Sequence, residues 1–198
     1  MVVFGITGGS GSGKTSVSNM LENLGVHIID TDVIAHEIVE PNSECLNELV
    51  DYFGDSILND DKTLNRKKLA SIAFSDKQKT VALSNITHKY IKAEVVKDIN
   101  TTDAELVGID GAVIIGSNVE PLCEFIVSVI ADKQSRITRI KTRDNITDEQ
   151  AIQRINAQND DEFYKENSMY IIYNNGDIAQ LESDVVGLFN KIKGNSFE

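Results

Sequence analysis

Short apolar runs alternate along this chain with stretches in which apolar residues recur every three or four positions. The runs predict five buried strands, over residues 2–6, 26–29, 106–109, 125–131 and 169–173. The first periodic stretch begins at Lys14, carries its apolar residues on one helical face and ends at Gly25. Strands that alternate with helices indicate an α/β fold with a five-stranded, mostly parallel sheet.

Residues 43–103 carry helical periodicity throughout, and they are too many for a simple crossover between two strands. We therefore predict a single domain of 1–198 with a three-layer α/β/α core over about 1–42, 104–132 and 168–198. The helical insertion, about 43–103, is predicted to bind an acceptor molecule. The charged stretch over about 133–160 is predicted to form a lid.

Charge and composition narrow the class of protein. The 198 residues carry a formal net charge of −12 with 41% hydrophobic residues, which is typical of a globular protein. A surface this acidic repels phosphate-rich partners, so we expect neither nucleic-acid nor membrane binding. No apolar run is long enough for a membrane span. Cys45 and Cys123 have no metal-ligand spacing and are expected to be buried free thiols, as in a reducing cytoplasm.

The segment Gly8-Gly9-Ser10-Gly11-Ser12-Gly13-Lys14-Thr15 matches the P-loop pattern at every specified position. Such a loop wraps a phosphate chain with its N–H groups, and the next helix points its N-terminus at the same charges. Lys14 should reach the β- and γ-phosphates, and the Thr15 hydroxyl should ligate Mg²⁺. The nucleotide contacts expected here are Gly8, Gly11, Ser12, Gly13, Lys14, Thr15 and Ser16.

Asp30 and Asp32 follow the second strand, where open α/β sheets bind their ligands. A carboxylate there can take the proton of an attacking hydroxyl. An aspartate there can also simply cap the next helix. We expect one residue of each kind, with Asp32 as the catalytic one.

Four arginines, Arg136, Arg139, Arg143 and Arg154, concentrate in the predicted lid. The first three share one helix face, because they are spaced three and four apart. Such a face could close over ATP and stabilise the transferred phosphoryl group. The alternative is a solvated helix whose arginines pair with Asp144, Asp148 and Glu149. We favour the lid.

Taken together, these motifs resemble the dephospho-CoA kinase family. Beyond the P-loop and the Asp30-Thr31-Asp32 strand end, the resemblance covers Phe53-Gly54, residues 64–69 and 73–76, Arg139 with Arg143-Asp144, residues 154–158 and Asn174-Asn175-Gly176. It implies Mg²⁺-dependent transfer from ATP to the ribose 3′-hydroxyl of dephospho-CoA in the cytoplasm, the last step of coenzyme A synthesis. The residue roles it implies are catalysis by Lys14, Asp32 and Arg139, ATP binding by Arg143, Asn174 and Gly176, and acceptor binding by Asp32, Arg66 and His88.

The chain departs from the family pattern at three places. Lys89 stands where a proline usually follows the histidine, residues 110–116 lack the usual proline and glutamate, and Arg136 stands in place of a lid glutamine. The first two departures lie on the presumed acceptor side. Alternatives are therefore a nucleoside or nucleotide kinase, or a divergent ATP-binding homologue with little activity. A guanine-specific switch is disfavoured, because residues 131–134 do not match its base-binding motif.

Overall fold

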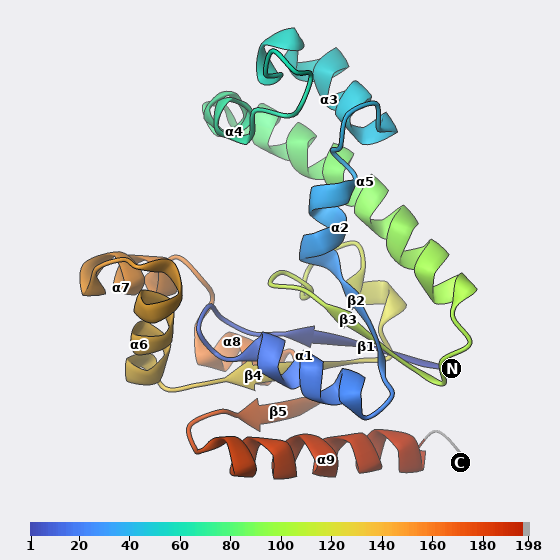
Figure 1. The fold of residues 1–198 in the computed structure, drawn as a ribbon, viewed down its shortest axis with the longest axis vertical. Coiled ribbons are helices and arrows are strands. Elements are labelled where there is room, and N and C mark those ends of the chain that lie inside the picture. The colour runs from blue at the N-terminus through green and yellow to red at the C-terminus, as the bar shows by residue number, and fades with distance from the viewer. Residues whose placement is uncertain (196–198) are drawn as a thin grey trace. The chain divides into compact units, whose positions relative to one another are not determined.

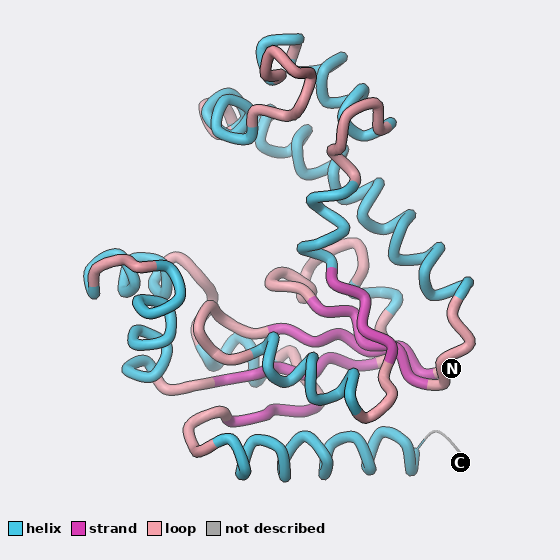
Figure 2. The backbone as a smooth tube through the Cα atoms, viewed as in Figure 1, coloured by secondary structure: helices cyan, strands magenta, loops and turns pink. Residues whose placement is uncertain are grey.

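The structure, a computed structural model, describes residues 1–195 and contains one five-stranded sheet (Figures 1 and 2). The strand order is β2-β3-β1-β4-β5. The strands are β1 (Val2–Thr7), β2 (His27–Asp30), β3 (Leu106–Asp110), β4 (Phe125–Ile130) and β5 (Tyr170–Tyr173). Parallel pairing joins β1 to β3 and β4, and β4 to β5. The predicted sheet is confirmed.

Helices α1 (Lys14–Asn23) and α9 (Ile178–Asn195) pack against each other on one face of this sheet (Figure 1). Phe4 and Ile6 of β1 point to this face and join the buried side chains of both helices. Gly5 faces the other side, beneath Ile114 and Cys123. On that side the 3-10 turn η2 (Glu120–Leu122) contacts β1, and α8 (Asp161–Glu166) contacts β4. Three layers result, as predicted.

The chain divides into two compact units. The first comprises Met1–Ile29 and the chain from Thr102 onward, and the second comprises Asp30–Thr101. The second unit holds α2 (Thr31–Glu37), α3 (Glu44–Phe53), η1 (Asp55–Ile57), α4 (Arg66–Ala73) and α5 (Lys77–Thr101). Residues 43–103 are mainly helical, as predicted, but the helical unit begins at Asp30 and not at about 43, because α2 packs against α5. Its acceptor-binding role stays a prediction. The last residues of the predicted core, 196–198, lie outside the described part of the chain.

An ion pair joins two helices of the second unit at one of the family departures. The Glu48 carboxylate on α3 accepts hydrogen bonds from Lys89 Nζ at 2.8 Å and from the Tyr90 hydroxyl at 2.7 Å, both on α5. The hydrogen bond from Lys89 is the main cause of a lowered pKa of the Glu48 carboxyl, and the hydrogen bond from Tyr90 lowers that pKa further. Lys89 therefore has a structural task where the family pattern has proline.

Two further helices, α6 (Lys133–Asp144) and α7 (Asp148–Asn156), form a hairpin in the first unit (Figure 1). Asp132 caps α6, and Thr147 with Gln150 forms a capping box at α7. The hairpin has a small apolar core made of Ile137, Ile140, Ala151 and Ile155. The predicted lid region thus consists of two packed helices.

Both cysteines are free thiols, as predicted. Cys45 is buried, whereas Cys123 is half-buried rather than fully buried. Burial raises the pKa of Cys45 to about 11 and that of Cys123 to about 12. Neither is therefore an activated thiolate at neutral pH. None of the helices in the described residues has the length and apolar character needed to span a membrane.

Candidate active site

The phosphate loop connects β1 to α1, as the sequence predicts. Gly13 is the N-cap of α1 and has a φ of 95°, a backbone conformation that favours glycine. A Cβ at Gly13 would also overlap the Asn174 side-chain amide. That amide, just after β5, donates a hydrogen bond to the Ser12 carbonyl at 2.8 Å. Asn174 is buried and braces the loop, a contact that joins residues 162 positions apart.

The N-terminus of α1 has the features of an anion site. No side chain caps it, and although the Ser16 N–H donates to the Gly13 carbonyl, the Lys14 and Thr15 N–H groups point out of the start of the helix toward a ligand. Thr15 and Ser16 are exposed in this first turn. The buried Ser12 hydroxyl lacks a hydrogen-bond partner within the described residues. A phosphate chain supplies acceptor oxygens for such donors, so the residues present fit a nucleotide.

Lys14 forms an ion pair with Asp110, the last residue of β3. The Lys14 side chain is 15% exposed and that of Asp110 is 5% exposed. The parallel register of β1 and β3 brings these two residues together. Asp110 lies opposite Ile6 on β1, and Ile6 is followed by Thr7 and then by the phosphate loop. The sequence analysis did not select Asp110 as a site residue. Its position at the carboxyl end of a predicted strand was the available signal.

We expect Asp110→Asn to lower kcat about a hundredfold, because the variant removes a buried charge beside the phosphate-binding lysine. Steady-state ADP release at saturating substrates measures this. Glu120→Gln is the matched control, since Glu120 lies in η2 and accepts from the Gly116 N–H. Equal kcat values for Asp110→Asn and the control would show that Asp110 serves the fold alone.

The arginine face of α6 lies on the phosphate loop. Arg139 donates to the Gly11 and Ser12 carbonyls, each at 3.3 Å, and to the Asn174 carbonyl at 3.0 Å. Arg143 lies further along the helix, and its guanidinium is 3.5 Å from the Ser10 hydroxyl. The structure thus brings the predicted arginines, the loop and Asn174 together within the first unit.

Two of the four arginines pair with an acidic neighbour, as the alternative interpretation predicts. Asp144 accepts from Arg143 and from Arg154. These two contacts lower the pKa of Asp144 to about 2, and the hydrogen bond from Arg143 has the larger effect. Arg154 is therefore neutralised at the surface, whereas Arg136 and Arg139 are turned onto the loop.

In the second unit, the two aspartates at the end of β2 and the start of α2 have different roles. Asp30 is the N-cap of α2 and accepts from the backbone N–H groups of Asp32 at 2.8 Å and Val33 at 3.1 Å. Asp32 is exposed in the first turn of the same helix. The expected structural residue is thus Asp30. Asp32 is not the cap, so the end of α2 does not depend on its carboxylate.

Arg66, at the start of α4, reaches the helix that carries Asp32. Its guanidinium is 2.9 Å from Nδ1 of His36 on α2. His36 follows Asp32 by four positions, so both lie on one face of α2. The sequence analysis missed His36, because a single histidine on a short helix has no motif. His88 is exposed on α5, and Gly176 is exposed between β5 and α9.

Comparison with known proteins identifies the family. The family model described as dephospho-CoA kinase matches residues 2–180. The chain belongs to the dephospho-CoA kinase family. The dephospho-CoA kinase of Lactobacillus johnsonii is 34% identical over 95% of this chain and 96% of its own length. That of Listeria monocytogenes is also 34% identical, over 96% of this chain and 97% of its own.

Solved structures agree with this assignment. The dephospho-CoA kinase from Campylobacter jejuni superposes with a TM-score of 0.69 at 26% identity, covering 98% of each chain. A Thermus thermophilus protein shares the fold with a TM-score of 0.83 at 23% identity, over 96% of this chain and 97% of its own. Shikimate kinase from Acinetobacter baumannii shares the fold less closely, with a TM-score of 0.55 at 19% identity, covering all of this chain and 96% of its own. The predicted P-loop kinase fold and the predicted dephospho-CoA kinase family are therefore confirmed.

Proposed function

We propose that this chain transfers the γ-phosphoryl group of ATP to the ribose 3′-hydroxyl of dephospho-CoA, in the cytoplasm and with Mg²⁺. The observation that carries the proposal is the complete phosphate loop, with Lys14 at the N-terminus of α1, in a chain that matches this kinase family over residues 2–180. The acidic net charge fits a small-molecule acceptor better than a nucleic acid.

On the nucleotide side, the loop N–H groups and the start of α1 hold the phosphates of ATP. Lys14 exchanges its contact with Asp110 for the β- and γ-phosphate oxygens and neutralises their charge. Thr15, which is exposed in the first turn of α1, would hold Mg²⁺ through its hydroxyl, since this ion keeps few protein ligands. The ion supplies further neutralisation of charge on the transferred group. Gly176 lies beside the adenine in this proposal.

On the acceptor side, Asp32 takes the proton of the 3′-hydroxyl as that oxygen attacks the γ-phosphorus. The bond from the γ-phosphorus to the bridging oxygen breaks, and ADP leaves with the electron pair. Arg139 and Arg143 stabilise the charge of the phosphoryl group in transit. Arg66, supported by His36, and the exposed His88 contribute to acceptor binding.

The test is a coupled ADP-release assay with ATP·Mg²⁺ and dephospho-CoA, run beside a panel of nucleosides and nucleotides. We expect turnover that is selective for dephospho-CoA and that stops when EDTA removes Mg²⁺. Phosphate analysis of the product should place the new group on the 3′-oxygen. A sample lacking any acceptor is the control for simple ATP hydrolysis.

Two results would contradict the substrate assignment. Turnover on another acceptor, with none on dephospho-CoA, would keep the kinase but replace its substrate. ATP binding without turnover on any acceptor would identify a homologue that has lost catalysis. Because residues 110–116 depart from the family pattern on the presumed acceptor side, the choice of acceptor should be tested first.

A further inference from the structure

Arg136 is a buried cation that the transfer reaction does not explain. It is 5% exposed, and together with Asp110 it makes up the buried charged side chains of the described residues. Burial of a guanidinium away from water is unfavourable unless its N–H groups find partners. The hydrogen-bond partners of Arg136 therefore indicate its role.

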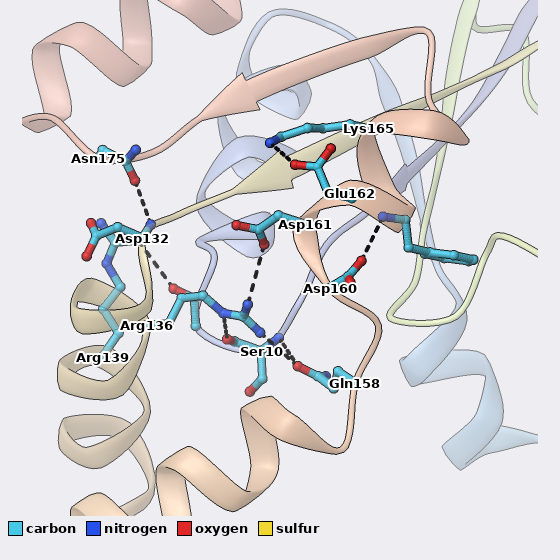
Figure 3. A network of polar contacts seen from close by, with 12 residues as sticks. Ser10, Asp132, Arg136, Arg139, Gln158, Asp160, Asp161, Glu162, Lys165 and Asn175 are labelled. Carbon is cyan, nitrogen blue, oxygen red and sulfur yellow. Dashed lines mark hydrogen bonds and ion pairs between the residues drawn. The ribbon is translucent and has the colours of Figure 1, made fainter.

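Those partners lie on the phosphate loop and beside it (Figure 3). Arg136 Nε donates to the Ser10 carbonyl at 2.9 Å, and an NH2 nitrogen of the same guanidinium donates to Gln158 Oε1 at 3.0 Å. The remaining nitrogen, NH1, lies 3.7 Å from Asp161 at the start of α8. The Arg136 guanidinium therefore contacts both the phosphate loop and the segment that follows α7.

Gln158 completes the arrangement. The same Oε1 atom accepts from the Ser10 backbone N–H at 2.8 Å. Both backbone polar groups of Ser10 are therefore held, its carbonyl by Arg136 and its N–H by Gln158. A Cβ on Gly9 would overlap the guanidinium, so the charge lies directly against the loop backbone.

The orientation of one peptide group follows from these bonds. In a trans peptide the C=O and the next N–H point in opposite directions. Because the Ser10 carbonyl points at Arg136, the Gly11 N–H points away from it. A fixed cation at the carbonyl end of this dipole also strengthens the positive potential at the N–H end. Such an N–H is a preorganised donor for a phosphate oxygen.

We propose that Arg136 and Gln158 are a positioning pair that holds the loop at Gly9-Ser10-Gly11 in its phosphate-binding conformation. The pair sets the affinity for the nucleotide and leaves acceptor binding unchanged. This inference rests on the loop being the ATP site, but it is independent of which acceptor the kinase uses. Neither residue touches the reacting atoms, so both act through the loop backbone.

The first test is Arg136→Met, which keeps much of the side-chain volume and removes every donor. We expect the dissociation constant for ATP·Mg²⁺, measured by calorimetry, to rise about tenfold to a hundredfold. At saturating ATP we expect kcat within about threefold of the native value and an unchanged KM for the acceptor. Lys141→Met is the matched control on the same helix, because the ion pair of Lys141 is with Asp148 on α7.

A second pair of variants covers the case in which Arg136→Met fails to fold. Gln158→Glu keeps an oxygen acceptor for Arg136 and Ser10, whereas Gln158→Met removes it. We expect Gln158→Glu to bind ATP far more tightly than Gln158→Met. Equal ATP affinities for these two variants, or a folded Arg136→Met protein with native ATP affinity, would overturn the proposal. Failure of dephospho-CoA as acceptor would leave the binding series interpretable.

Discussion

Lys14→Ala should abolish measurable phosphoryl transfer, with kcat/KM reduced at least about a thousandfold. The lysine follows the last glycine of the loop and is placed at the N-terminus of α1, where phosphate charge accumulates. Without the lysine, the negative charge that builds up on the phosphate oxygens as the γ-phosphoryl group separates from ADP is no longer neutralised. Steady-state ADP release with dephospho-CoA measures the loss. Lys97→Ala is the control, because Lys97 pairs with Glu94 on the surface of α5.

Stability must be separated from catalysis in this variant. Removing Lys14 deletes its ion pair with the buried Asp110 carboxylate, which by itself lowers the free energy of unfolding. The double variant Lys14→Ala/Asp110→Asn removes both charges. We expect it to regain thermal stability relative to Lys14→Ala while remaining inactive. Near-native turnover in a folded Lys14→Ala protein would refute the role of the loop.

Asp32→Asn should reduce kcat about a hundredfold to ten-thousandfold while the affinity for ATP·Mg²⁺ stays close to native. Asparagine keeps the shape of the side chain but cannot take the proton of the acceptor hydroxyl. The helix should survive the change, because Asp30, not Asp32, caps α2. Single-turnover kinetics and ATP calorimetry on the same sample measure the two quantities.

Asp30 provides the matched control for this experiment. Asp30→Asn should retain both stability and turnover, since asparagine caps helices as well as aspartate does. Asp30→Ala should cost about 1 kcal/mol of stability. A native kcat in Asp32→Asn would exclude Asp32 as the base. A loss of kcat in Asp30→Asn as large as that in Asp32→Asn would indicate that the two residues act through helix placement.

Prediction from the sequence succeeded where the determining interactions are local. Apolar periodicity located the strands and helices, since burial of one face requires that pattern. The capping box of Thr147 and Gln150 lies within four residues and depends on local spacing alone. The same holds for the phosphate loop, whose donors are consecutive backbone groups. Asp30 and Asp32 could be placed at a strand end, but their division of roles required the observed cap.

The sequence alone determined the α/β fold, the nucleotide loop and the kinase family, because each depends on residues close together or on an ordered series of motifs. Which distant side chains support the loop follows from the three-dimensional fold. Asp110 meets Lys14 across 96 positions, Arg136 meets Ser10 across 126, and Asn174 meets Ser12 across 162. These contacts arise from strand order and helix packing. No local spacing encodes them, so the arginines could be recognised as a face without revealing which of them would be buried against the loop.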